Sequence, residues 1–87
     1  MPVVWIPSLL RQLTGGLETI TVQGTTVREV IDSLDTLYPG IKQRICTGDS
    51  LRPGIAVMID SEVARLGLHQ PVPEASEVHI VPAIAGG

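Results

Sequence analysis

The chain has 87 residues, of which 44% are hydrophobic, and its formal net charge is −3. This length fits one compact domain and leaves little room for a cofactor cavity, because ligand pockets usually take hundreds of Å³. The six Lys and Arg residues are scattered along the chain, which argues against a nucleic-acid partner, because phosphate binding needs a basic patch.

Residues 1–7 lack the basic region of a signal peptide, and no stretch approaches the ~20 apolar residues of a membrane span. The single Cys46 excludes an internal disulfide and suits a reducing compartment. We therefore expect a soluble, cytoplasmic protein without a membrane partner.

The first 22 residues predict a hairpin. Residues 3–6 are rich in β-branched side chains and end at a proline, and residues 17–22 alternate between apolar and polar, so both segments are expected to be strands. Between them, residues 8–16 end in a Gly-Gly turn signal and predict a loose loop or a short helical turn.

A helix is predicted to start after Thr26, which forms a capping box with Glu29. Apolar residues then recur at helical spacing, giving one stripe made of Val27, Val30, Ile31, Leu34 and Leu37. The sequence Tyr-Pro-Gly at residues 38–40 is expected to end this helix.

The segment 41–51 predicts one further helical turn at Ile41 and Ile45, followed by a loop at residues 47–50. The continuous apolar run at residues 55–59 predicts a strand covered on both faces.

A tight turn is expected at residues 60–62, and residues 63–65 are interpreted as a short return strand. Pro71 and Pro73 bracket an irregular stretch, and residues 77–81 predict the last strand, which stops at Pro82.

One amphipathic helix needs one apolar sheet face to cover it. The order hairpin, helix, strand, irregular return and strand therefore predicts an α+β fold: a two-layer roll of the β-grasp (ubiquitin-like) type, with a mixed sheet packed on one main helix. We expect the β-grasp domain to span residues 1–82 and a flexible C-terminal tail to span residues 83–87.

The sequence shows no catalytic constellation, so we expect a protein that is not an enzyme and holds no cofactor or metal. His69 and His79 have no metal-ligand spacing with each other or with Cys46. We interpret His79 as pointing outward from the last strand, His69 as lying in a loop, and Cys46 as a buried or partly buried small apolar residue.

The unusual feature is Gly86-Gly87 after a short segment beyond the last strand. Five extended residues reach about 17 Å, at roughly 3.4 Å each, and two residues without Cβ can pass a narrow channel. An α-carboxylate, ionised at neutral pH, can attack the α-phosphate of ATP and give an acyl-adenylate that a sulfur nucleophile opens. A frayed glycine tail is the alternative interpretation.

The chain resembles the MoaD/ThiS-type ubiquitin-like sulfur carriers over essentially its whole length, with the closest likeness to the CysO type. The residues that carry this resemblance are IPSLLR at 6–11 with TGG at 14–16, and VPAIAGG at 81–87. The chain departs from some of these carriers in its low aromatic content, since Trp5 and Tyr38 are its only aromatic residues.

The resemblance implies a cycle in which an E1-like enzyme of the MoeB/ThiF type uses ATP to adenylate Gly87, and a sulfur donor converts the adenylate to a thiocarboxylate. In CysO-type systems a PLP-dependent cysteine synthase accepts the sulfur and a zinc metallopeptidase later frees cysteine. In the MoaD type the acceptor is the large subunit of molybdopterin synthase, and in the ThiS type it is thiazole synthase. Ala85 and Gly86 would pass into the partner's active site. For Ile84 and Pro82, apolar contact with a partner and packing at the edge of the core are equally open.

Two further classes stay open. A ubiquitin-like protein modifier would use the same Gly87 to form isopeptide bonds with lysines, and a plain β-grasp interaction module would not need its tail.

Overall fold

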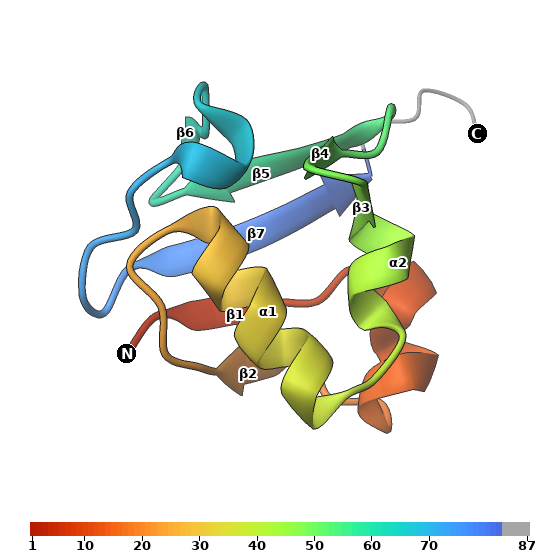
Figure 1. Cartoon of the computed structure of the whole chain (residues 1–87). Helices are drawn as coiled ribbons and strands as arrows, with labels where there is room; N and C mark the ends of the chain where they lie inside the picture. Colours follow the sequence, from red (N-terminus) through yellow and green to blue (C-terminus); the bar gives the residue numbers. More distant parts are fainter. Residues whose placement is uncertain (83–87) are drawn as a thin grey trace.

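The computed structural model describes residues 1–82, so the predicted tail at residues 83–87 lies outside the described part (Figure 1). Its main layer is a five-stranded sheet with the order β2-β1-β7-β5-β6. The strands are β1 (Val3–Trp5), β2 (Thr19–Thr21), β5 (Ile55–Ile59), β6 (Glu62–Val63) and β7 (Glu77–Pro82).

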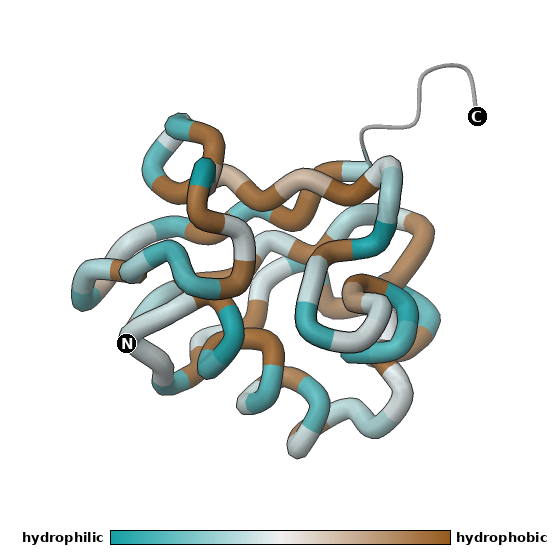
Figure 2. The backbone as a smooth tube through the Cα atoms, turned by 45° about the horizontal axis from the view of Figure 1, so that its top comes forward, coloured by the Kyte–Doolittle hydropathy of each residue, from teal (hydrophilic) through white to brown (hydrophobic). Residues whose placement is uncertain are grey.

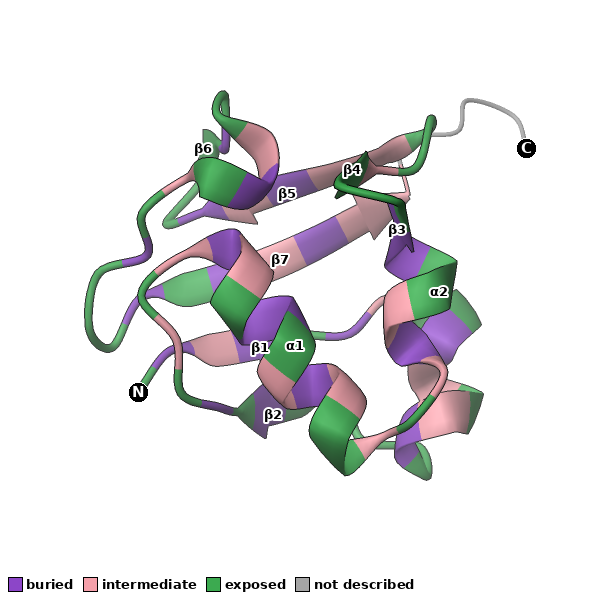
Figure 3. Ribbon diagram, in the orientation of Figure 1, coloured by how far each residue is buried: buried purple, intermediate pink, exposed green. Residues whose placement is uncertain are grey.

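The sheet is mixed. β1 runs parallel to β7 in the centre, whereas the pairs β1–β2, β5–β7 and β5–β6 are antiparallel. Buried and less buried residues alternate along β7, so one face of the sheet is covered (Figure 3). On β5 only Val57 and Ile59 are buried. The prediction that both faces of this strand are covered is therefore wrong, because within residues 1–82 no second layer lies on the outer face of the sheet.

Helix α1 (Val27–Leu37) packs on the covered face of the sheet. Along its tube in Figure 2 hydrophobic and hydrophilic segments alternate, as expected for a helix with one buried face. Val27, Val30, Ile31 and Leu34 are each at most 2% exposed. The two-layer α+β roll predicted from the sequence is thus confirmed.

Leu37 was expected in the buried stripe, but 56% of its surface is exposed. Leu37 stands in the last turn and lies about 60° around the helix axis from Leu34, at the margin of the apolar stripe. Tyr38, which follows it, packs partly against the core instead.

The start of α1 is capped as predicted, because the Thr26 hydroxyl accepts a hydrogen bond from the Glu29 amide at 3.2 Å. The return contact differs from a standard capping box. The Glu29 carboxylate accepts hydrogen bonds from the amide and hydroxyl of Thr25, one residue earlier than expected.

Short helical segments complete the layer around α1: η1 (Ser8–Thr14), α2 (Ile41–Ile45) and η2 (Gly67–His69). Of the two alternatives for residues 8–16, the structure selects the helical one, a 3-10 helix that ends at Gly15 in the left-handed conformation. Thr14, only 1% exposed, donates its hydroxyl hydrogen toward the carbonyls of Arg11 and Leu17 and closes the segment.

The predicted loop at 47–50 belongs instead to a small hairpin of β3 (Cys46–Thr47) and β4 (Ser50–Leu51). The return strand after the tight turn is β6, which begins one residue earlier than expected. Asp60 and Ser61 at that turn both have positive φ, at 49° and 73°, as a tight hairpin turn between twisted strands requires.

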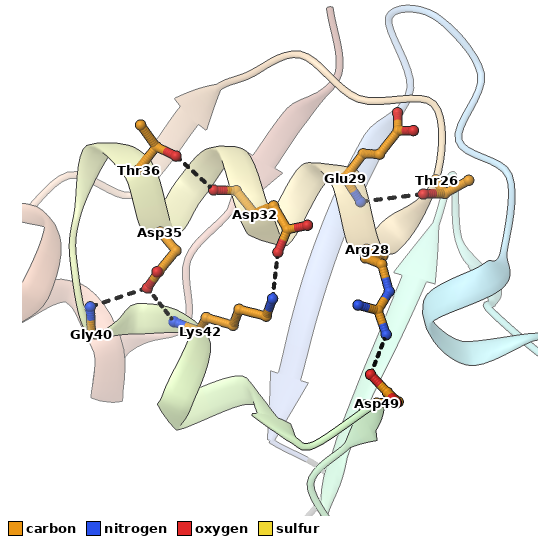
Figure 4. A network of polar contacts seen from close by, with 9 residues as sticks. All are labelled: Thr26, Arg28, Glu29, Asp32, Asp35, Thr36, Gly40, Lys42 and Asp49. Atoms are coloured by element: carbon orange, nitrogen blue, oxygen red, sulfur yellow. Dashed lines mark hydrogen bonds and ion pairs between the residues drawn. The ribbon is translucent and has the colours of Figure 1, made fainter.

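Polar contacts fix α2 and the β3–β4 hairpin to the exposed face of α1 (Figure 4). Lys42 pairs with Asp32 at 2.6 Å, and Arg28 pairs with Asp49 at 2.8 Å. Asp35 accepts hydrogen bonds from the amides of Gly40 and Lys42, which caps the start of α2. Together with the fully buried Ile41 and Ile45, these contacts set the position of α2.

None of the helices within residues 1–82 is long and apolar enough to cross a membrane.

Candidate functional site at the end of the last strand

Strand β7 carries the chain to one end of the sheet, where Pro82 pairs with Ile55 at the start of β5. Val78 and Ile80 anchor the strand in the core, with 1% and 4% exposure. Proline has no amide hydrogen to give to a ladder bond, which is the physical reason to predict a strand end at this residue. The structure describes β7 as far as Pro82, which is also the last residue that it describes, so the end of the strand at Pro82 stays a prediction.

A groove of about 190 Å³ lies beside this point. We call it the tail-root groove. It is lined by Pro7, Leu9, Leu10, Arg44, Arg52, Pro53, Ile55 and Pro82. These residues come from the turn after β1, from η1, α2, the connection between β4 and β5, and the ends of β5 and β7. In Figure 1 the arrowhead of β7 lies at the same end of the molecule as α2 and the β3–β4 hairpin.

The groove is apolar in its wall and basic at its rim. Leu10 is buried, whereas Leu9 beside it leaves 67% of its surface exposed. Arg44 and Arg52 place two guanidinium groups at this groove, although the net charge of the chain is −3. The Arg52 Nε donates a hydrogen bond to the Gln43 carbonyl at 2.7 Å, which fixes its side chain against α2.

The predicted site residues fall on both sides of the described boundary. Pro82 is half-buried and contributes to the groove wall. Ile84, Ala85, Gly86 and Gly87 lie outside the described residues, so their roles remain predictions.

The other chemistry-bearing side chains lie apart from the tail-root groove. Cys46 is 6% exposed, as predicted, and burial raises the pKa of its thiol, which keeps it protonated at neutral pH. His69 is exposed in η2, a short helical turn where a loop was predicted. No group of three His, Cys, Asp or Glu side chains within residues 1–82 could hold a metal ion.

His79 points outward from β7, as predicted, and stacks on Trp5 with ring centroids 5.3 Å apart. The Trp5 indole donates a hydrogen bond to Glu77 at 3.0 Å. In the strand register, Met58 and Val63 continue the row that Trp5 and His79 begin. This row lies on the sheet face opposite α1. Trp5, one of the two aromatic residues noted in the sequence, therefore lies on the outer sheet face.

Sequence reasoning named Pro82 as a candidate contact residue but did not predict the groove that it lines. Leu9 and Leu10 belong to the segment 6–11 that carries the family resemblance, so that segment was a usable signal for one wall. Arg44 and Arg52 had no such signal, because only the packing of α2 and of the β4–β5 connection brings them together.

A mixed sheet with the parallel pair β1–β7 at its centre, packed on one main helix, defines a β-grasp, ubiquitin-like protein. The model of the ThiS family matches residues 4–87, and the chain belongs to this family. The sulfur carrier protein CysO of Mycobacterium tuberculosis H37Rv is 34% identical, covering 97% of this chain and 96% of that protein.

Comparison with solved structures gives the same family likeness. The crystal structure of the Amycolatopsis orientalis BexX/CysO complex matches with a TM-score of 0.94 and 36% identity over the whole of both chains. M. tuberculosis CysO matches with a TM-score of 0.89 and 30% identity, covering 97% of this chain and all of that one. The small archaeal modifier protein 1 of Methanosarcina acetivorans matches with a TM-score of 0.82 and 27% identity, covering 99% and 95% of the two chains. Sulfur carriers of this type are small non-catalytic proteins, and the chain is not an enzyme.

Proposed function

We propose that the chain is a sulfur carrier whose working group is the carboxylate of Gly87. The observation that carries this proposal is its similarity over nearly its full length to CysO sulfur carriers. The sheet geometry supports it, since β7 is anchored in the core and delivers the chain at one edge of the molecule.

In the proposed reaction a Gly87 carboxylate oxygen attacks the α-phosphate of ATP on an E1-like adenylating enzyme, and pyrophosphate leaves. A sulfur donor then attacks the acyl carbon, and AMP leaves with the oxygen that was transferred to phosphorus. The product is a C-terminal thiocarboxylate. Ala85 and Gly86 pass through the partner's channel, which needs residues with small side chains or none.

The acceptor that we favour is a PLP-dependent cysteine synthase, because the similar carriers are of the CysO type. The buried, protonated Cys46 thiol does not compete as a sulfur-carrying group.

A protein modifier is the second candidate, favoured by the similarity to a small archaeal modifier protein. Both functions begin with adenylation of Gly87, and they differ in whether sulfur or a lysine amine opens the adenylate.

The test is intact mass spectrometry after incubation with the E1-like enzyme of the same genome, ATP and sulfide. We expect a mass increase that matches the exchange of one oxygen for sulfur, and no change in a variant that lacks Gly87. Isopeptide-linked conjugates without any thiocarboxylate would favour the modifier. A chain that remains unmodified where an established carrier is adenylated would count against both.

A further inference from the structure

The chain carries a single side-chain amine. Its six Lys and Arg residues are five arginines and one lysine, Lys42. A guanidinium stays protonated at neutral pH and does not act as an amine nucleophile. Lys42 is therefore the one side chain at which an activated carboxyl group could form an isopeptide bond with this chain.

The Lys42 amine is held against a carboxylate. Lys42 stands in the first turn of α2, and its side chain extends back to α1, where Nζ lies 2.6 Å from Asp32 Oδ1 (Figure 4). Its backbone is fixed as well, because its amide donates a hydrogen bond to the Asp35 carboxylate and its carbonyl accepts one from the Cys46 amide. The Lys42 side chain remains 35% exposed, so the ion pair, and not burial, has to limit its reactivity.

The charges around Nζ favour the ammonium form. The hydrogen bond to Asp32 raises the pKa of Lys42 above its ordinary value of 10.5, although the positive charge of Arg28 acts in the opposite direction. The nearby Cys46 thiol is protonated at neutral pH and adds no charge. Nucleophilic lysines have the opposite surroundings, a cation or an apolar pocket that lowers the pKa.

An amine with the ordinary pKa of lysine is unprotonated in only about one molecule in 2,500 at pH 7, and the ion pair with Asp32 reduces that fraction further. The α-amine of Met1 is also held against a carboxylate, since it lies 3.0 Å from both carboxylate oxygens of Glu74.

We infer that the Lys42–Asp32 ion pair protects the carrier from acylation by the activated Gly87 of another copy. This inference rests on the proposed function and adds to it a property of the carrier's own surface. The suppressed reaction is attack of unprotonated Nζ on the acyl carbon of the adenylate: a C–N bond forms, AMP leaves with the bridging oxygen, and the amine proton goes to solvent. Because a protonated Nζ has no free electron pair, the adenylate persists until a sulfur nucleophile opens it.

The first test does not involve the tail. The carrier is acetylated with the N-hydroxysuccinimide ester of acetic acid from neutral pH to about pH 10, and peptide mapping by mass spectrometry separates adducts at Lys42 from adducts at Met1. We expect Lys42 in Asp32→Asn to react roughly two- to fivefold faster than in wild type, which is the factor that an exposed ion pair contributes to an equilibrium. The curve of rate against pH should also shift to lower pH, because the variant loses the carboxylate that raises the pKa of Lys42.

Asp49→Asn is the matched control. It removes the other ion pair on the exposed face of α1, with Arg28 at 2.8 Å, and leaves the Lys42 contact in place. We expect its Lys42 to react as in wild type. Equal rates in wild type and Asp32→Asn would overturn the inference. An equal rise in both variants would overturn it too, because it would report a loosened contact between α1 and α2.

The second test uses the activated tail. The carrier is incubated with the E1-like enzyme and ATP without a sulfur donor, and mass spectrometry counts covalent dimers linked through Lys42. We expect more dimers from Asp32→Asn than from wild type, and none linked at residue 42 in Lys42→Arg. Where the adenylate forms, equal amounts in wild type and Asp32→Asn, including none in both, would overturn the inference. A wild type that is not adenylated would reject the carrier function instead, and the acetylation rates would then decide whether the ion pair protects Lys42.

Discussion

The burial difference between two leucines on one helix gives the sharpest test of how α1 packs. Leu34 is fully buried against the sheet, whereas Leu37 is 56% exposed one turn later. Replacing a buried leucine by alanine costs about 2–5 kcal/mol, through lost transfer free energy and the cavity left behind. A domain of 87 residues unfolds with roughly 4–13 kcal/mol, so Leu34→Ala removes a large share of the total.

Each kcal/mol lowers Tm by about 4–8 °C in a domain of this size. We therefore expect Leu34→Ala to lower Tm by at least about 8 °C. Leu37→Ala should change the free energy of unfolding by no more than about 0.5 kcal/mol. Both changes alter helix propensity equally, so their difference isolates burial. Urea unfolding followed by circular dichroism measures the free energy of unfolding of both variants, and thermal unfolding measures their Tm. Equal losses, or a loss below about 1 kcal/mol for Leu34→Ala, would refute the packing described above.

Further predictions concern the core, a close backbone approach, a charged turn and the tail. Val30→Asp places a charge at a position 1% exposed, and we expect a circular dichroism spectrum of an unfolded chain; a native spectrum would contradict the burial of this face. Gly24→Ala would set a Cβ 2.7 Å from the Val30 amide nitrogen, and we expect a loss of about 1–3 kcal/mol in urea unfolding, so an unchanged midpoint would argue against this approach. Hydrogen bonds from the Glu77 amide and the Ser76 hydroxyl hold the pKa of Asp60 below its ordinary value of 3.8. A lowered pKa stabilises the fold above that value and ceases to do so as pH falls through the folded pKa. Asp60→Asn should thus lower Tm at pH 7, and its Tm should approach that of wild type in acid. A Tm difference that grows in acid would contradict a lowered pKa of Asp60. Removing Gly87 should leave Tm nearly unchanged; a large fall would show that the tail packs.

The elements with a clear period could be predicted from the sequence alone. The stripe from Val27 to Leu34 repeats at helical spacing and is buried as expected, because a helix with one apolar face must cover it. The helix cap could be predicted too, because capping depends only on neighbouring residues. The Thr26 hydroxyl accepts a hydrogen bond from the Glu29 amide, as expected.

Predictions were wrong where a distant element decides the outcome. Leu37 fits the periodic pattern, but no apolar surface among residues 1–82 covers it, and its side chain stays exposed. The run at 55–59 is continuously apolar, yet Ala56 and Met58 face a side of the sheet that no second layer covers in the described part of the chain. Periodicity describes one element and says nothing about what lies opposite.

The sequence by itself determined the class of fold, the presence of the last strand and the Gly-Gly signal at residues 86–87, because these depend on local pattern and composition. Only the tertiary structure decided the surroundings of the end of that strand. Leu9, Arg44 and Arg52 are far apart in the chain, and their common groove exists because the packing of η1, α2 and β5 brings them to the edge where β7 ends. Contacts between distant segments arise from the packing of whole elements and leave no pattern in any one segment.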